Sequence, residues 1–204
     1  MILPKAWLRE RRKDYFYRRA KEEQLRSRAA YKLLEVVDRY NLIRPGDVVV
    51  DLGAAPGGWM QAALRAVGEK GYVLGVDVKE IEPLEAENSR SIICDINDDG
   101  IVGTIRGFLP RSVADVVLSD VSPNISGVWE VDHARQVDLS RRSLLIAASV
   151  LRHGGNVFVK VFQGDLMDDF VYEVRQEFGF VRLLKPAASR KKSSELFVLG
   201  MKKR

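Results

Sequence analysis

Cysteine and histidine are scarce in this chain of 204 residues, which has one cysteine, Cys94, and two histidines, His133 and His153. A single cysteine excludes an internal disulfide and makes a reducing compartment, the cytoplasm, the expected location. These residues form no spaced cluster, so we expect no metal site. No apolar run approaches the roughly 20 residues of a membrane helix, so we expect no membrane partner. The apolar start is too short for a signal peptide.

Internal repeats, low-complexity tracts and linkers rich in Pro, Gly or Ser are also absent. Hydrophobic residues make up 46% of the chain and charged residues 30%, a globular composition that excludes a disordered or collagen-like protein. We therefore expect residues 1–204 to form a single domain, acting as a monomer, with a basic helical extension over about residues 1–26.

Charge is distributed unevenly along the chain. Residues 1–32 carry a net charge of +7 and residues 185–204 a net charge of +6, whereas residues 33–184 carry −8. Five aromatic residues lie within the first basic stretch. Phosphates bind Arg and Lys, and unstacked bases stack on aromatic rings, so this composition favours RNA as the partner. The alternative is a solvated helix whose aromatic rings pack onto the domain.

Helical and strand patterns alternate through most of the chain, which predicts a doubly wound α/β sheet. The predicted helices cover 8–26, 28–40 (with Ser27 as N-cap), 57–66, 98–107, 133–151 and 165–178. The predicted strands cover 48–53, 72–77, 91–94, 115–119, 156–162, 180–184 and 195–201. No helix separates the last two strands, so a hairpin would make the final strand antiparallel, with the basic tract 189–193 as its exposed loop.

The segment DLGAAPGGW, residues 51–59, lies between a predicted strand and a predicted helix. Ligands of open α/β sheets bind at such strand ends, and small residues let the backbone approach the ligand closely. The segment lacks the dinucleotide fingerprint G-x-G-x-x-G and the Lys-Ser/Thr of a P-loop. It resembles instead motif I of S-adenosylmethionine (SAM)-dependent methyltransferases.

Acidic residues end the next two predicted strands. Asp77 stands where a ribose diol needs a bidentate acceptor, and its alternative role is that of a turn residue. Asp95 could read an adenine amino group, or could cap the helix predicted at 98–107.

Lysine and glutamate residues near other strand ends could carry chemistry. Lys160 lies in the apolar run VFVKVF, where an uncompensated charge is costly to bury, and Glu195 opens the last strand. Lys32 lies in the helix predicted at 28–40. Taken singly, each fits an ordinary solvated or snorkelling charge.

Together with RAAYKL (28–33), SDVSPN (119–124), VK (159–160) and SE (194–195), the segment at 51–59 resembles, in chain order, the FtsJ-type ribosomal RNA ribose 2′-O-methyltransferases. The resemblance spans essentially the whole chain. It implies a SAM-dependent methyltransferase fold with a seven-stranded, mostly parallel sheet and an antiparallel last strand. It also implies two sets of site residues, a catalytic tetrad of Lys32, Asp120, Lys160 and Glu195, and a SAM site of Gly53, Gly57, Gly58, Trp59, Asp77, Asp95 and Asp120.

The implied reaction needs a base, because a ribose hydroxyl is a poor nucleophile until its proton is removed. A free lysine, with a pKa of about 10.4, is mostly charged at neutral pH. A neighbouring cation favours its neutral form, whereas the carboxylates of Asp120 and Glu195 oppose that shift, so the sequence leaves the net sign open. We expect Lys160 to be the general base, oriented by Asp120, while Lys32 and Glu195 position Lys160 and the ribose. The expected substrate is a uridine of the large-subunit ribosomal RNA.

Three other functions compete with this interpretation, and the sequence argues against the last two. A transfer RNA methyltransferase acting on an anticodon loop would share the tetrad. A non-catalytic RNA-binding module would have no need of Lys160. A nicotinamide dehydrogenase would need the missing G-x-G-x-x-G.

Overall fold

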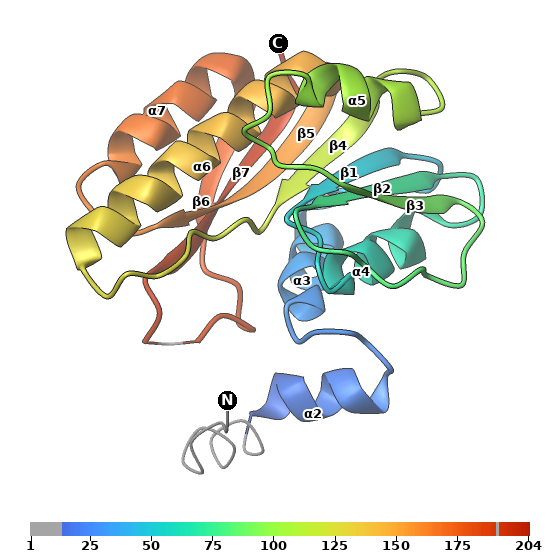
Figure 1. The fold of residues 1–204 in the computed structure, drawn as a ribbon, viewed down its shortest axis with the longest axis horizontal. Coiled ribbons are helices and arrows are strands. Elements are labelled where there is room, and N and C mark those ends of the chain that lie inside the picture. The colour runs from blue at the N-terminus through green and yellow to red at the C-terminus, as the bar shows by residue number, and fades with distance from the viewer. Residues whose placement is uncertain (1–13, 191) are drawn as a thin grey trace.

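The structure, a computed structural model, describes residues 14–190 and 192–204, and builds them around one seven-stranded sheet (Figure 1). The strand order is β3-β2-β1-β4-β5-β7-β6. The strands are β1 (Val48–Leu52), β2 (Tyr72–Asp77), β3 (Ser89–Ile93), β4 (Ala114–Ser119), β5 (Leu151–Phe162), β6 (Phe178–Leu184) and β7 (Glu195–Lys203). The order reverses between β1 and β4, which places a crevice at their carboxyl ends.

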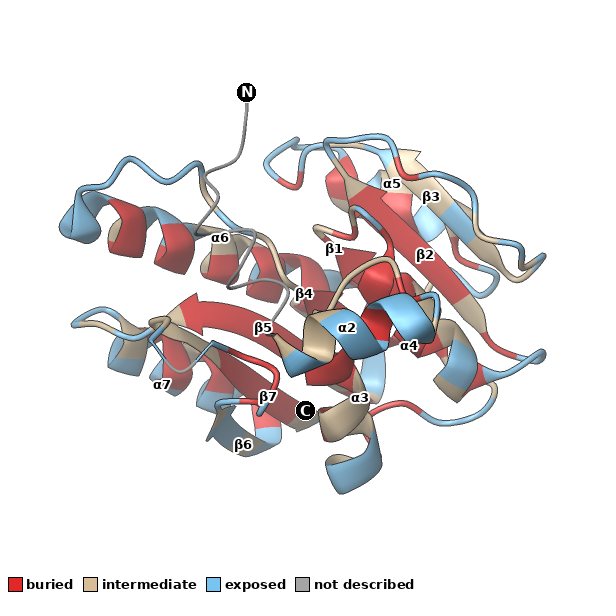
Figure 2. Cartoon of the chain, turned by 90° about the horizontal axis from the view of Figure 1, so that it is seen from below, coloured by how far each residue is buried: buried red, intermediate tan, exposed pale blue. Residues whose placement is uncertain are grey.

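Helices cover both faces of the sheet. They are α2 (Tyr15–Glu22), α3 (Ala30–Tyr40), α4 (Gly58–Val67), α5 (Ile101–Phe108), α6 (Trp129–Val150) and α7 (Met167–Glu177). One apolar cluster joins the sheet to α5, α6 and α7, and the other joins it to α3 and α4. The doubly wound architecture predicted from the sequence is confirmed, and Figure 2 shows the buried central strands between these layers.

The central strands form because their residues are apolar on both faces. All five residues of β1 are buried, and this strand pairs in parallel with β2 and β4. Continuous burial suits a parallel strand that is covered by helices on both sides. The carboxyl ends of β1, β2 and β4 therefore meet at one edge of the sheet, where the functional residues were predicted.

The last two strands depart from the parallel pattern, as predicted. Strand β7 is antiparallel to both β5 and β6, and lies between them. Its register sets Phe197 opposite Lys160 and Glu195 opposite Phe162. The start of β7 therefore lies beside the carboxyl end of β5.

Several predicted boundaries were wrong. The helix predicted at 8–26 is described only as α2, and residues 1–13 of the predicted basic extension lie outside the described residues. Ser27 is not an N-cap, because α3 begins at Ala30 after Ala29, without a side-chain cap. Helix α6 starts four residues earlier than predicted, and β5 begins at Leu151 rather than at 156.

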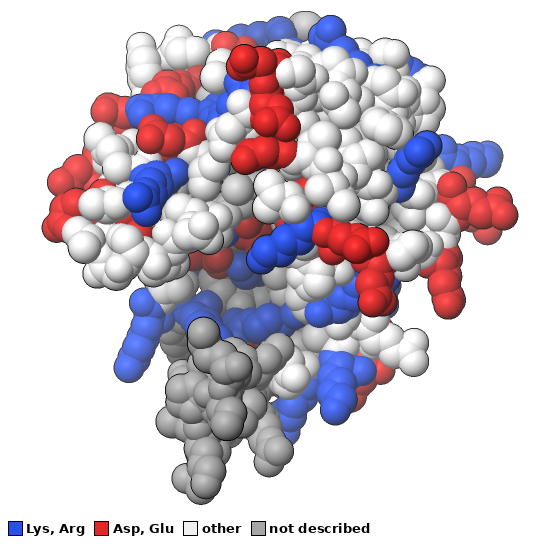
Figure 3. All heavy atoms as spheres, in the orientation of Figure 1, with Lys and Arg blue, Asp and Glu red and all other residues white. Residues whose placement is uncertain are grey.

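Charged side chains are segregated on the surface, as the sequence indicated. Lys and Arg dominate the lower part of the molecule in Figure 3, at the level of α2, whereas acidic side chains are prominent on the body above it. Among the residues that the structure describes, no helix is long and apolar enough to cross a membrane.

Candidate active site

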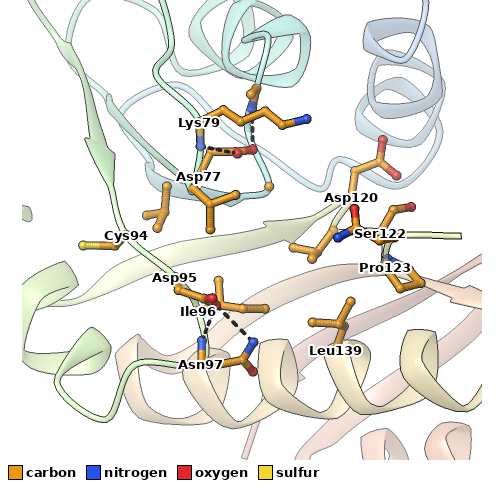
Figure 4. Close-up of a pocket in the computed structure, with 16 residues that line it drawn as sticks. Asp77, Lys79, Cys94, Asp95, Ile96, Asn97, Asp120, Ser122, Pro123 and Leu139 are labelled. Carbon is orange, nitrogen blue, oxygen red and sulfur yellow. Dashed lines mark hydrogen bonds between the residues drawn. The ribbon is translucent and has the colours of Figure 1, made fainter.

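A pocket of about 420 Å³ opens at the carboxyl ends of the central strands (Figure 4). Its wall is built by the segments that follow β1, β2, β3 and β4, with Leu139 of α6 closing one side. The polar and charged lining includes Asp77, Lys79, Asp95, Asn97, Asp120, Ser122 and Asn124. Three carboxylates against one lysine give this pocket a negative lining, which suits a ligand that carries positive charge.

Asp77 lies in the pocket wall with both carboxylate oxygens fixed by the backbone. One oxygen accepts a hydrogen bond from Ala55 N and the other from Lys79 N, each at 2.9 Å. A carboxylate has about four lone-pair sites, so Asp77 retains acceptor capacity for a ligand. The bond to Ala55 also ties the end of β2 to the glycine loop that follows β1.

Asp95 lines the opposite part of the pocket and does not cap α5. Its Oδ1 accepts from Asn97 N at 2.9 Å and from Asn97 Nδ2 at 3.0 Å, whereas α5 begins at Ile101 after Gly100. The capping role that the sequence left open is therefore wrong. Cys94, the single cysteine, lies beside Asp95 in the same wall.

Glycines shape the loop after β1. Gly53 lines the pocket with a φ of +74°, and a Cβ there would meet Val121 within 3.0 Å. A Cβ on Gly58 would overlap the Oγ of Ser27, so the glycine allows the segment before α3 to pack against the start of α4.

Gly57, Gly58 and Trp59 do not line the pocket. The Trp59 indole is buried, and its Nε1 donates to Ala29 O at 2.7 Å. The indole stacks on Phe158, with 5.5 Å between the ring centroids. The Trp59 side chain therefore packs in the core and does not reach the pocket. The backbone N–H groups remain, because those in the first turn of a helix have no partner within it.

The four residues of the predicted tetrad, far apart in the sequence, lie together beside this pocket. Lys32 Nζ lies 2.7 Å from Glu195 Oε1 and 3.9 Å from Asp120 Oδ2. Lys160 Nζ lies 3.1 Å from Asp120 Oδ1, so Asp120 bridges the two lysines. Lys32 and Lys160 are only 8% and 5% exposed, so both side-chain nitrogens depend on these partners.

Two serines that sequence reasoning missed complete the cluster. Lys160 donates to the main-chain oxygen of Asp120 at 2.8 Å and to Ser122 Oγ. Ser189 donates from its Oγ to Glu195 Oε1 at 2.8 Å, and it is buried, contrary to the exposed loop predicted over 189–193. Ser122 could have been found from its place two residues after Asp120, whereas no local signal marks Ser189.

Behind the pocket, Asp51 is a fully buried carboxyl group. Neither of its oxygens has a hydrogen-bond partner among the described residues. Burial raises the pKa of Asp51 well above its usual range, and the nearby Asp120 and Asp77 carboxylates raise it further. The folded protein therefore favours the protonated form of Asp51.

Asp115 lies near the start of β4, and its pKa is shifted in the opposite direction to that of Asp51. It accepts from Val48 N at 2.7 Å, Arg152 Nε at 2.5 Å and Arg111 Nη2 at 2.8 Å. Burial alone raises the pKa of Asp115, but the Val48 hydrogen bond and the two guanidinium groups outweigh it, so the net shift is downward.

The substitutions Asp51→Asn and Asp115→Asn should therefore have opposite effects. A raised pKa gives stability that is present at low pH and lost as the pH rises through the folded-state pKa. Relative to the wild type, Asp51→Asn should therefore gain free energy of unfolding as the pH rises from 5 to 9. A gain of about 1 kcal/mol corresponds to an increase of about 2–4 °C in Tm.

Asp115→Asn should instead lose about 1–3 kcal/mol at neutral pH, because the lowered pKa contributes stability that disappears only as the pH falls. Denaturant unfolding across this pH range checks both signs. If the free energy of unfolding of Asp51→Asn and of the wild type changed in parallel with pH, the raised pKa of Asp51 would be contradicted.

Comparison with known proteins identifies the family. Residues 25–203 match the model of the FtsJ-like methyltransferase family. A ribosomal RNA large subunit methyltransferase E of Methanothrix thermoacetophila is 51% identical over 190 residues, which is 93% of this chain and 72% of the relative. Its counterpart in Methanothermobacter thermautotrophicus is 47% identical over 96% of this chain and 92% of the relative.

A solved structure agrees with this result. A protein of Plasmodium falciparum, assigned as a ribosomal RNA methyltransferase, superposes with a TM-score of 0.77 at 26% identity, and the match covers 88% of this chain and all of that one. The family model covers the whole sheet and all four residues of the tetrad. The chain belongs to the FtsJ-like methyltransferase family.

Proposed function

We propose that the protein transfers a methyl group from SAM to the ribose 2′-hydroxyl of a uridine in large-subunit ribosomal RNA. The observation that carries this proposal is the position of Asp120, which lines the pocket and contacts both lysines of the tetrad. A pocket for the methyl donor therefore adjoins a group that can take a proton. The curated relatives, named as large-subunit ribosomal RNA methyltransferases, favour this substrate over a transfer RNA anticodon loop.

The pocket residues fit SAM. The volume of the acidic pocket lies within the range of small-molecule sites, and the acidic lining of this pocket suits a sulfonium cation. When bound, SAM supplies an electrophilic methyl group. Asp77 would accept from the ribose hydroxyls of SAM and Asp95 from its adenine amino group. Gly53 would allow close approach of the backbone, and the backbone N–H groups at Gly58 and Trp59 would hold its carboxylate.

The tetrad would activate the nucleophile. A neutral Lys160 amine can donate to Asp120 O and Ser122 Oγ, and its lone pair then remains free to accept the 2′-hydroxyl proton on Nζ. Lys32 shares the Asp120 carboxylate with Lys160, so the two lysine side chains are held on the same group. Glu195 holds Lys32 at 2.7 Å, so its role is to position that cation.

We place the reaction in the cytoplasm, because one cysteine suits a reducing compartment. The proposed form is a monomer in which residues 1–204 make one methyltransferase domain, since both apolar clusters pack on a single sheet. The two basic ends would contact the RNA.

The product tests the proposal directly. Wild-type protein, incubated with methyl-labelled SAM and unmodified large-subunit RNA, should yield a nuclease-resistant dinucleotide that contains a 2′-O-methylated uridine. Nucleoside mass spectrometry identifies the position of the label, and transfer RNA serves as the competing substrate. A label on a base, or faster labelling of the transfer RNA, would contradict the assignment.

A further inference from the structure

A second cavity, of about 470 Å³, lies between α2 and the body of the protein. We call it the α2 pocket. Its lining comes from α2, the segment before α3, the glycine loop and the β6–β7 connection. The charged members are Asp14, Lys21, Arg26, Arg28 and Arg190, and Tyr17 and Pro56 add apolar surface. Four cations and one carboxylate line this cavity, so its character is opposite to that of the acidic pocket beside the tetrad.

The cations of the α2 pocket are only partly neutralised. Arg28 pairs with Asp14 and donates to Ala188 O. Arg26 donates to the main-chain oxygens of Pro56 at 3.2 Å and Pro83 at 2.8 Å, and has no carboxylate partner among the described residues.

Arg190 and Lys21 also have no carboxylate partner within the described part of the chain. Burial, together with repulsion by the neighbouring Arg190, lowers the pKa of Arg28. An anion placed between these guanidinium groups would remove that repulsion. The α2 pocket therefore has the electrostatics of a phosphate site.

The α2 pocket and the tetrad share structural elements. Arg28 contacts Ala188, and the next residue, Ser189, donates to Glu195. Glu195 in turn contacts Lys32, which lies four residues after Arg28 in the chain. On the other side, Pro56 belongs to the glycine loop that also contributes to the acidic pocket. A strand of RNA with its ribose at the tetrad would therefore have its adjoining backbone within reach of the α2 pocket.

We propose that the α2 pocket binds a nucleotide adjoining the methylated one, with its phosphodiester on Lys21 and Arg190. This proposal rests on the function proposed above, because it takes single-stranded RNA as the substrate. Single-stranded nucleic acid is held by a basic groove with aromatic surface beside it, and the α2 pocket combines both through its cations and Tyr17. Arg26 and Arg28 are already held by main-chain oxygens and by Asp14, so they would define the shape of this pocket.

The test compares two double variants, each of which removes two positive charges. Lys21→Ala/Arg190→Ala removes the two unpaired cations of the α2 pocket. Arg44→Ala/Lys70→Ala removes two exposed cations at the amino ends of β1 and β2, far from the site. The dissociation constant of a single-stranded RNA that carries the target uridine is measured by fluorescence anisotropy at several salt concentrations.

The α2-pocket variant should bind this RNA about tenfold more weakly than the wild type, as expected when charge-assisted hydrogen bonds to phosphate are removed. The slope of the logarithm of the binding constant against the logarithm of the salt concentration should become shallower by about 0.7 for each phosphate that the variant no longer binds. At saturating RNA the single-turnover methylation rate should stay within about twofold of the wild type, because the tetrad is intact. Equal weakening in the two variants would show that net charge alone matters, and would overturn the proposal.

Truncated RNAs locate the bound nucleotide. Oligonucleotides that lack the residues on either the 5′ or the 3′ side of the target uridine are compared for the wild type and the α2-pocket variant. One truncation should abolish the difference in affinity between the two proteins, since its missing nucleotide no longer occupies the α2 pocket. If neither truncation does so, the α2 pocket binds no adjoining nucleotide.

The two proposals can fail separately. If the wild type methylates the ribose and the α2-pocket variant binds RNA normally, only the assignment of the α2 pocket is wrong. If the wild type makes no 2′-O-methyl product but the binding contrast holds, the proposed reaction is wrong and the RNA subsite stands. Selective binding of an acidic peptide to the α2 pocket, without RNA, would also overturn the subsite.

Discussion

Replacing Lys160 by alanine should slow single-turnover methyl transfer by about 10²–10⁴-fold, the usual contribution of a general base. Lys160 Nζ lies against Asp120 and Ser122 at the edge of the acidic pocket, and it does not line that pocket. The affinity for SAM, measured by calorimetry, should therefore change little. Rapid quenching of a reaction with saturating RNA and SAM measures the chemical step.

Arginine at position 160 separates a base from an electrostatic contact. Guanidinium stays protonated at accessible pH, so Lys160→Arg should lose almost as much activity as Lys160→Ala. Near-normal chemistry in Lys160→Arg would assign the proton transfer to Asp120 or to water, and would leave the ribose methyltransferase proposal intact.

Asp77→Ala should weaken SAM binding by about 1.5–3 kcal/mol, the effect of removing a charged hydrogen-bond acceptor. This corresponds to roughly 10- to 150-fold in Kd. Both Asp77 oxygens also hold backbone N–H groups, of Ala55 and Lys79, so part of the loss should come from a looser glycine loop. Titration calorimetry gives the affinity.

Glu80→Ala is the matched control for Asp77→Ala. It removes one negative charge three residues away, from an exposed side chain that does not line the acidic pocket. We expect Glu80→Ala to bind SAM as the wild type does. Equal affinities in Asp77→Ala and the wild type would remove Asp77 from the binding site.

The sheet could be predicted from the sequence because its central strands are continuous apolar runs between turns. Prediction failed where tertiary contacts outweigh local pattern. The first residues of β5 include Arg152, His153 and two glycines, which carry no strand pattern. Arg152 is held by Asp115 at 2.5 Å, and Leu151 pairs with Ala114, so contacts with β4 extend the strand there.

The start of α6 was missed for a similar reason. Its first turn contains Trp129 and Val131, both exposed, so no apolar face indicates a helix. Asp132 accepts from Ser126 N at 2.8 Å and from Gly127 N at 3.1 Å, and this holds the preceding loop against the helix. Such a contact depends on the folded path of the loop and has no signature in local composition.

The tetrad was predicted through the family resemblance, since each member alone fits an ordinary charge. Lys32 and Glu195 are 163 residues apart in the sequence. The antiparallel insertion of β7 brings Lys32 Nζ to 2.8 Å from Glu195 Oε2. The same insertion places Ser189 beside Glu195, which no local pattern indicates. The sequence also carried no sign that the Trp59 side chain packs in an aromatic cluster with Phe158 and Phe197.

Strand β7 follows β5 and β6 in the chain, yet it lies between them in the sheet. Until the ribosome has made the chain through Lys203, β5 has an unpaired edge and β6 has no neighbouring strand. Such edges favour aggregation and need protection in a nascent chain. Because β7 also carries Glu195, a nascent chain has an incomplete tetrad. The cluster of Lys32, Asp120, Lys160 and Glu195 is therefore assembled only when β7 has inserted between β5 and β6.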